Sequence, residues 1–217
     1  GLTEMASQVT TTPPGASPDQ LRTSGRLLPH RELTIDSSGE ILVRGATLAR
    51  GCLDGAVMHS LADPNGWYHT ADLGNLDPDG YLRLLGRRDN MFISGGENIH
   101  PESIERTLLE LPGITEAVVV AVDDEEYGQR PFAFISIATD VSEDLPLLVR
   151  LIRDYLALTG GAADTPVQVR HLLKSALPHY AVPVGFAFIP DHARRGLKPD
   201  RPALELLARE LRSRPAR

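Results

Sequence analysis

Residues 86–105 read GRRDNMFISGGENIHPESIE, and the character of the chain changes at this stretch. Before it, short apolar runs alternate with turn residues. After it, apolar residues recur at helical as well as at strand spacing. Two arginines beside Asp89 at such a break indicate a hinge whose side chains can donate hydrogen bonds to phosphate or ribose oxygens. We therefore expect a β-rich segment up to about residue 87 and a compact α/β domain after it.

The segment before the break is predicted to consist mainly of hairpins. Two pairs of apolar runs each flank a turn of the form Asp-x-x-Gly, in which glycine supplies a positive φ: 33–35 and 41–43 around Asp36–Gly39, and 75–76 and 81–85 around Asp77–Gly80. Residues 10–24 are rich in Thr, Pro, Gly and Ser, which predicts a surface loop.

The segment after the break is predicted to alternate helices and strands. Pro101 and Glu102 favour a helix start, because proline and acidic side chains suit a first helical turn. The remaining pattern predicts helices at 147–158, from 165 onward and around 204–211, strands at 117–122, 132–137 and 184–189, and a basic loop at 192–198.

Composition excludes several classes of protein. The 217 residues include a single cysteine, Cys52, which excludes a disulfide framework and a cysteine zinc site and favours a cytoplasmic protein. A net charge of −7 argues against nucleic acid as the main partner. No apolar run approaches the roughly 18 residues of a membrane span. Because the chain begins at Gly1, we expect it to be a piece of a longer protein. The sequence leaves open whether identical subunits assemble.

Two polar clusters before the break suit nucleotide chemistry. Thr3 and Glu4 place a hydroxyl beside a carboxylate, a pair that can hold a phosphate and its Mg²⁺ because this cation prefers oxygen ligands. The alternative for this pair is an ordinary helix cap. Asp72, followed closely by Gly74, can accept hydrogen bonds from both ribose hydroxyls, and its alternative is a plain Asp turn.

Two more clusters lie after the break. Ser94-Gly95-Gly96-Glu97 follows an apolar run, and the glycines permit close approach of the backbone to a ligand. Lys198 lies in a basic loop that contains glycine, where a mobile positive charge can stabilise phosphate oxygens in a transition state. The alternative for both is a solvated loop, and taken singly these clusters indicate no more than nucleotide binding.

The order and spacing of the clusters resemble the adenylate-forming superfamily, which comprises acyl- and aryl-CoA synthetases, peptide-synthetase adenylation domains and luciferases. The matching segments are 1–4, similar to the end of Tyr-Gly-x-Thr-Glu; 68–74, similar to Tyr-x-Thr-Gly-Asp-Leu-Gly with Ala71 in place of glycine; 86–105, similar to Gly-Arg-x-Asp-x-x-Ile-x-Gly-Gly-x-x-Ile-x-Pro-x-x-Ile-Glu; and 196–201, similar to Gly-Lys-x-x-x-Arg with Leu197 inserted. Segments 1–7, 63–74 and 124–131 resemble most the o-succinylbenzoate–CoA ligases of menaquinone biosynthesis.

The resemblance implies an α+β protein. Residues 1–87 would be the β-barrel-like end of a large N-terminal domain, 88–89 the hinge, and 90–217 a small mobile α/β domain. The implied reaction joins a small carboxylic acid, in this branch 2-succinylbenzoate, to coenzyme A in two steps. Carboxylate and ATP first give an acyl-adenylate and pyrophosphate, with Mg²⁺ as the metal. Coenzyme A then attacks the adenylate as co-substrate.

The resemblance also implies roles for individual residues. Thr3 and Glu4 would contact the phosphates, with Glu4 at the Mg²⁺. Asp72 and Arg87 would hold the ribose, and Asp89 would be the hinge. Lys198 would bridge the acyl carboxylate and the α-phosphate during adenylation. After a rotation of the small domain, Ser94, Gly95, Gly96 and Glu97 would line the channel for coenzyme A.

Three alternatives stay open. The protein could use another acyl or aryl acid, or it could load a carrier protein instead of coenzyme A. The third alternative is a non-catalytic, truncated binding module. The family's phosphate loop, expected upstream of Gly1, is absent from this sequence. We therefore expect the 217-residue chain alone to bind ATP poorly and to have little ligase activity.

Overall fold

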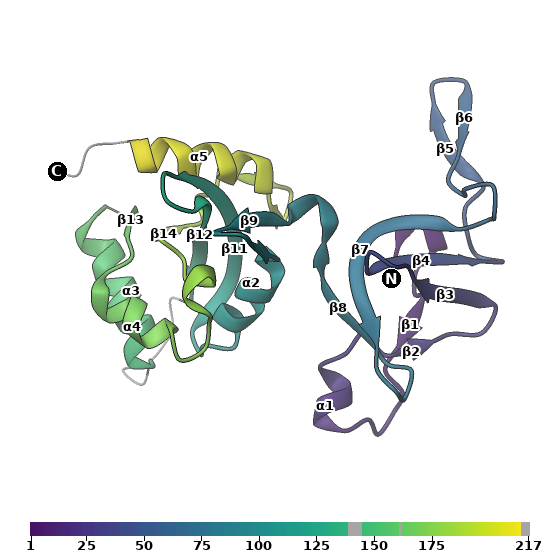
Figure 1. Ribbon diagram of the computed structural model, residues 1–217, viewed down its shortest axis with the longest axis horizontal. Helices are drawn as coiled ribbons and strands as arrows, with labels where there is room; N and C mark the ends of the chain where they lie inside the picture. Colours follow the sequence, from purple (N-terminus) through teal and green to yellow (C-terminus); the bar gives the residue numbers. More distant parts are fainter. Residues whose placement is uncertain (139–144, 161, 214–217) are drawn as a thin grey trace. The chain divides into compact units, whose positions relative to one another are not determined.

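The computed structural model describes residues 1–138, 145–160 and 162–213. These residues form two compact units, Gly1–Asp89 and Asn90–Arg217, which are drawn in purple to teal and in teal to yellow in Figure 1. Among the described residues, no helix has the length and apolar character needed to cross a membrane.

The first unit is built on an antiparallel sheet with the strand order β3-β4-β7-β8. The predicted hairpins are confirmed, since β3 pairs with β4 and β7 pairs with β8. Its elements are η1 (Thr3–Met5), β1 (Thr10–Thr11), α1 (Pro18–Leu21), β2 (Arg26–Leu27), β3 (Arg31–Ile35), β4 (Glu40–Gly45), β5 (Gly51–Asp54), β6 (Val57–Ser60), β7 (Tyr68–Leu76), β8 (Leu82–Arg87) and η2 (Arg88–Asn90).

One type of turn recurs three times in this unit. Asp36 Oδ1 accepts hydrogen bonds from the backbone N–H groups two and four residues later, and Asp63 and Asp77 do the same in their turns. The glycine three residues after each Asp has a positive φ, which is 86° at Gly39, 83° at Gly66 and 80° at Gly80. The carboxylate thus replaces backbone partners that the bend removes, which explains why Asp-x-x-Gly specifies these turns.

Two expectations for the first unit were wrong. Residues 10–24 are not a plain loop. Thr10–Thr11 pairs with β2, and α1 begins after a capping box formed by Ser17 and Gln20. The unit is also not a barrel, because the sheet is open and, among the described residues, no pairing joins β8 to β3. Closure into a barrel requires every edge strand to find a partner.

The second unit contains a six-stranded sheet in which β12 is central. β12 pairs antiparallel with β11 and β9 and parallel with β14, while β10 and β13 extend the sheet outward. The elements are β9 (Phe92–Ser94), β10 (Glu97–Ile99), α2 (Pro101–Leu109), β11 (Ile114–Asp124), β12 (Gly128–Ile137), α3 (Leu147–Leu158), β13 (Ala162–Asp164), α4 (Val167–Leu173), η3 (His179–Ala181), β14 (Gly185–Phe188), β15 (Arg194–Arg195), β16 (Lys198–Pro199) and α5 (Arg201–Ser213).

Helices cover both faces of this sheet. Alternate residues of β11 divide between two apolar cores: Val119 and Ala121 pack with α2, α3 and α4, whereas Val118 and Val120 pack with α5. Figure 1 shows α5 on the side of the sheet opposite α3 and α4. The predicted α/β layering is confirmed, and the helix expected at 147–158 is found with those bounds.

Short strands account for the differences from the expected second unit. The basic loop expected at 192–198 contains the two-stranded ribbon β15–β16. The apolar run before Ser94-Gly95-Gly96 is strand β9, as expected, but its partner β10 and the edge strand β13 were not foreseen, because strands of three residues are too short to show a periodic pattern.

Candidate functional site

Thr3 and Glu4 lie in η1, a single turn anchored by Met5, whose side chain is completely buried. The turn closes on itself, since the Ser7 N–H donates to the Leu2 carbonyl and the Leu2 N–H donates to the Ser7 carbonyl. Ala6 and Ser7 both have positive φ values, of 54° and 125°. A sparsely populated backbone conformation is kept only where the surroundings enforce it, which makes this turn a candidate ligand contact.

Asp72 and Arg87 are opposite residues of β7 and β8. The Arg87 guanidinium donates to Asp72 Oδ1 and to Asp89 Oδ2, each over 3.1 Å. The two carboxylates raise the pKa of Arg87 against the opposing effect of burial. Arg87 therefore links Asp72, the predicted ribose ligand, to Asp89, the predicted hinge residue. The cluster offers a bound ligand both hydrogen-bond donors and hydrogen-bond acceptors.

Tyr68 connects this cluster to η1 and was not among the nominated residues. Its pKa is raised, first by burial and then by the charge and hydrogen bonding of Glu4, while Arg87 acts in the opposite direction. Tyr68 is therefore coupled electrostatically to Glu4 as well as to Arg87. Its place at the start of the 68–74 motif is the sequence signal that could have found it.

A buried carboxylate, Glu40, supports the cluster from behind and was also missed. The side chain of Glu40 is 1% exposed and accepts from Arg88 Nη1 over 2.9 Å and from the Ala71 N–H over 2.8 Å. His69 Nδ1 lies 3.2 Å from the same carboxylate, which is the largest cause of the raised pKa of His69. His69 thus contacts the supporting carboxylate and has a structural role.

Ala71 occupies the position where the resembling motif has glycine, and its φ is +59°. An alanine in this region costs about 1–2 kcal/mol relative to the right-handed conformation, whereas glycine adopts it freely. After the larger chain entropy of glycine is subtracted, we expect Ala71→Gly to stabilise the first unit by about 0.5–1 kcal/mol. Urea unfolding followed by the fluorescence of Trp67, the single tryptophan, measures the change.

The matched control for that substitution is Ala46→Gly, because Ala46 is exposed and does not have a positive φ. There the same replacement should destabilise by about 0.5–1 kcal/mol, since only the entropic cost remains. Equal effects of the two substitutions would contradict backbone strain at Ala71.

Ser94, Gly95, Gly96 and Glu97 form the β9–β10 hairpin, in which Ser94 pairs with Glu97. Gly95 and Gly96 both have positive φ, the pattern of a tight two-residue turn. Ser94 is buried and Glu97 is exposed. A Cβ on Gly95 would lie 2.7 Å from the Tyr127 ring, whereas one on Gly96 would meet nothing within 4 Å. The absence of a side chain at Gly95 thus lets the Tyr127 ring pack against the turn, whereas the backbone at Gly96 has free space beside it.

We expect Gly95→Ala to destabilise the second unit by about 3 kcal/mol, because backbone strain adds to a clash with the Tyr127 ring. Gly96→Ala should cost only about 1 kcal/mol, since it carries the strain alone. Thermal unfolding of both variants by calorimetry tests the difference. Equal destabilisation by the two substitutions would show that the Tyr127 ring moves aside without an energetic cost.

Lys198 is the first residue of β16 and is exposed. It follows a two-residue turn in which Gly196 has a φ of +64° and Leu197 is 94% exposed. Within the described part of the chain, Lys198 makes no ion pair. Its ammonium group is therefore available to a ligand.

The nominated residues thus fall into two groups. Thr3, Glu4, Asp72, Arg87 and Asp89 gather in the first unit, and Ser94–Glu97 and Lys198 lie in two separate hairpins of the second. The described residues contain no group of three or more side chains suited to hold a metal by themselves. Glu4 fits Mg²⁺ in a weaker sense, since this ion commonly binds one or two carboxylates together with substrate phosphates.

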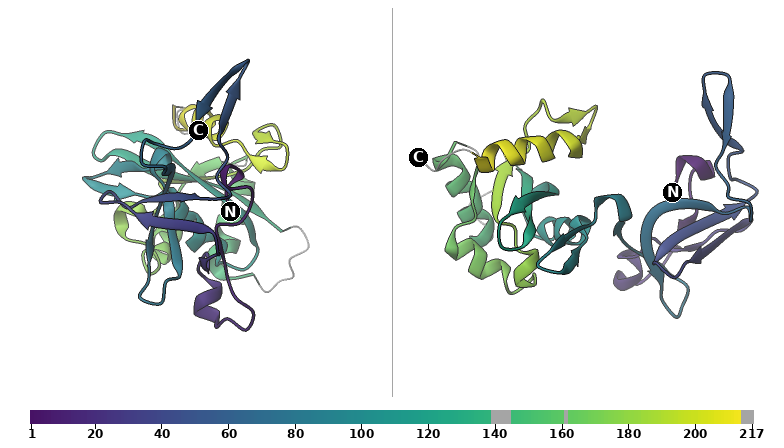
Figure 2. Two further views of the ribbon diagram at one scale, coloured as in Figure 1. Left: turned by 90° about the vertical axis from the view of Figure 1, so that its right-hand side faces the viewer. Right: turned by 45° about the horizontal axis from the view of Figure 1, so that its top comes forward.

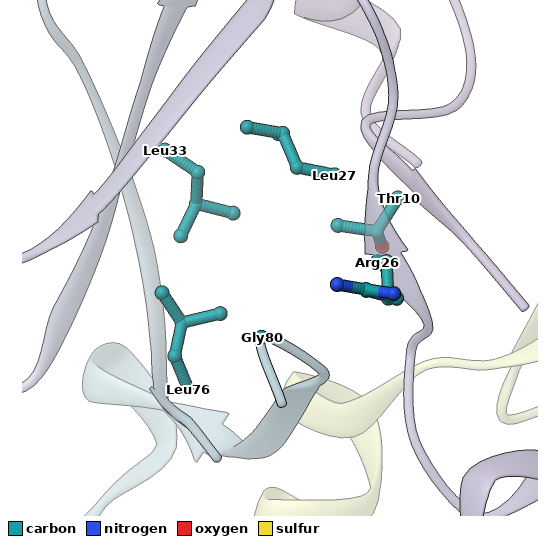
Figure 3. Close-up of a pocket in the computed structure, with 6 residues that line it drawn as sticks. All are labelled: Thr10, Arg26, Leu27, Leu33, Leu76 and Gly80. Carbon is teal, nitrogen blue, oxygen red and sulfur yellow. The ribbon is translucent and has the colours of Figure 1, made fainter. Parts of the chain in front are cut away.

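A separate groove of about 520 Å³ lies on the first unit (Figure 3). None of the nominated residues lines it, so it is distinct from the polar cluster. Its lining consists of Thr10, Arg26, Leu27, Leu33, Leu76 and Gly80.

The second unit matches a known family in sequence. Residues 103–196 match the AMP-binding enzyme C-terminal domain. A 2-succinylbenzoate–CoA ligase from Geobacillus kaustophilus is 37% identical over 166 residues, which cover 72% of this chain and 34% of that protein. The chain thus spans about a third of the length of the curated relatives it matches.

Solved structures extend the similarity to both units. The o-succinylbenzoate CoA synthetase from Bacillus subtilis, in complex with the acyl-adenylate intermediate OSB-AMP, is 30% identical with a TM-score of 0.71. The match covers 94% of this chain and 40% of that one. The same enzyme in complex with ATP and magnesium ion is 29% identical, again with a TM-score of 0.71 and covering 94% of this chain and 40% of that one.

Proposed function

We propose that this chain is the C-terminal part of an ATP-dependent 2-succinylbenzoate–CoA ligase, because residues 103–196 match the AMP-binding enzyme C-terminal domain. Residues 1–87 would be the end of its large domain, 88–89 the hinge and 90–217 its small domain. The observation that carries the proposal is the similarity to o-succinylbenzoate CoA synthetase, which extends over both units.

The small core of the first unit supports this division. Its main apolar cluster has five buried residues, Met5, Val9, Ile41, Val43 and Leu82, whereas the second unit has two larger buried clusters. A unit of this size with so few buried side chains gains little from the hydrophobic effect. In the proposed enzyme, the remainder of the large domain would pack against it.

The reaction would proceed in two steps. An oxygen of the substrate carboxylate attacks the α-phosphorus of ATP, which gives the acyl-adenylate and releases pyrophosphate. The thiol of coenzyme A, on losing its proton, then attacks the acyl carbon and releases AMP. Magnesium would neutralise phosphate charge when it is bound, with Glu4 as its protein ligand and Thr3 donating to phosphate oxygens.

The other residues would bind and orient the reactants. Asp72 would accept hydrogen bonds from the ribose, with Arg87 holding that carboxylate in place. Lys198 would place its positive charge between carboxylate and α-phosphate, where negative charge accumulates in the first step. The hairpin of Ser94–Glu97 would act in the second step, with Gly96 leaving room for the pantetheine arm of coenzyme A.

The test uses the complete protein that contains this chain. It is supplied with ATP, Mg²⁺, coenzyme A and equal amounts of 2-succinylbenzoate, benzoate and a medium-chain fatty acid, and the products are identified by mass spectrometry. The proposal expects the succinylbenzoyl thioester to dominate. Another dominant thioester would overturn the substrate assignment, and acyl-adenylate without thioester would indicate a carrier-protein acceptor. The absence of both products would favour a non-catalytic module.

A further inference from the structure

The ribbon β15–β16 has two unlike faces, and Lys198 lies on the outer one. In this ribbon Arg194 is opposite Pro199, and Arg195 is opposite Lys198. Because side chains alternate along a strand, Arg194 and Lys198 lie on opposite faces. The Arg194 side chain is 23% exposed and that of Arg195 is 78% exposed. The face that carries Arg194 is therefore the more buried one, and the face that carries Arg195 and Lys198 is the more exposed one.

The inner face is held by an ion pair to the main sheet. Arg194 Nη1 and Nη2 donate to the two carboxylate oxygens of Glu116 over 3.0 and 2.6 Å. Ser136, the residue opposite Glu116 on β12, donates its hydroxyl to the same carboxylate over 2.9 Å. The Arg194 hydrogen bond is also the main cause of a lowered pKa of Glu116. A bidentate pair fixes orientation as well as distance.

The same guanidinium also reaches the turn that precedes Lys198. Arg194 Nη1 lies 3.4 Å from the Leu197 carbonyl oxygen, to which it donates. Each strand of the ribbon has only two residues, and an isolated two-stranded hairpin is at best marginally stable in water. Figure 2 shows the ribbon beside the first turn of α5, at the margin of its unit. Arg194 therefore ties the ribbon to the main sheet from the inner face, while on the outer face Arg195 Nε donates to Asp200 Oδ2 over 2.6 Å.

We propose that Arg194 and Glu116 are a positioning pair for Lys198, which holds the ribbon so that its outer face presents the ammonium group. The inference rests on the proposed function, in which Lys198 acts while the acyl-adenylate forms. Loss of the pair frees the ribbon without removing Lys198. A displacement of about 1 Å at a reacting group is enough to cost on the order of 100-fold in rate.

The positioning role predicts a difference between the two half-reactions. In the complete protein, Arg194→Met and Glu116→Gln should lower the kcat of acyl-adenylate formation about 10- to 100-fold. Thioester formation from supplied acyl-adenylate and coenzyme A should change less than about twofold, because Lys198 has no role in that step. The kcat of acyl-adenylate formation in Arg194→Lys should lie between those of the wild type and Arg194→Met, since lysine restores the charge without the bidentate geometry.

Arg153→Met is the matched control, because Arg153 pairs with its exposed neighbour Asp154 on α3, away from the ribbon. This variant should leave both half-reactions unchanged. Hydrogen–deuterium exchange gives a readout besides activity: Arg194→Met should speed exchange in a peptide covering residues 194–199, with the peptides of β11 and β12 unaffected.

Equal losses in both half-reactions, or wild-type exchange of residues 194–199 in Arg194→Met, would overturn the positioning role. An inactive wild-type protein whose Arg194→Met variant still exchanges faster at the ribbon would overturn the proposed function. In that outcome Arg194 would remain the anchor of the ribbon, so the two failures are distinguishable.

Discussion

Lys198→Ala should lower the rate of acyl-adenylate formation by the complete protein by about 100- to 1000-fold, the loss typical when one preorganised charge or donor is removed from a transition state. The side chain is exposed at the end of a tight turn and, among the described residues, has no ion-pair partner. Its removal therefore leaves no buried charge behind. The fold should be unchanged, and the loss should be confined to the step in which charge accumulates between carboxylate and α-phosphate.

The measurement is single-turnover acyl-adenylate formation, with thioester formation from supplied acyl-adenylate as the companion assay. Lys174→Ala is the matched control, because Lys174 is an exposed lysine of the same unit at the end of α4. An adenylation rate of Lys198→Ala within about threefold of the wild type would show that the inserted Leu197 has moved the catalytic position elsewhere.

Local rules account for what the sequence could predict. The turns at Asp36 and Asp77 were predictable because each carboxylate bonds to backbone groups no more than four residues away. The helix 147–158 was predictable because Leu148, Ile152, Tyr155 and Leu156 recur at helical spacing, and the structure buries Ile152 and Leu156 together with Val149. The third turn has the same Asp-x-x-Gly pattern, at Asp63–Gly66. The β5–β6 ribbon, which projects from its unit in Figure 1, has a different local signal, the pair Asp54-Gly55 at its turn.

The supporting contacts of the site were not predictable by such rules, because their partners are distant in sequence. Arg194 is 78 residues from Glu116, and Arg201 is 96 residues from Glu105. Arg201 belongs to the 196–201 motif, and in the structure it anchors the start of α5 to Glu105. No periodicity in either segment indicates which carboxylate an arginine will meet, since that depends on how the sheet and helices pack.

Glu40→Gln should be the most destabilising conservative change in the first unit, at about 2–3 kcal/mol. The glutamine oxygen can still accept from the Ala71 N–H, but the new amide group points donors at Arg88 and His69, which are themselves donors. Breaking a buried pair costs about 3–5 kcal/mol, and the lower figure applies here because Arg88 is 49% exposed and can regain water.

Glu32→Gln is the control that distinguishes the cost of breaking a buried ion pair from the cost of breaking an exposed one. Glu32 on β3 also pairs with an arginine, Arg44, over 2.7 Å, but its side chain is 58% exposed. An exposed pair contributes about 0–1 kcal/mol, so this control should scarcely shift the urea midpoint of the Trp67 transition. If the two variants lost equal stability, the exposed fraction of the carboxylate would not decide the cost. A larger loss in Glu40→Gln would instead identify Glu40 as the residue that ties Arg88, next to the proposed hinge, to the sheet that carries Asp72.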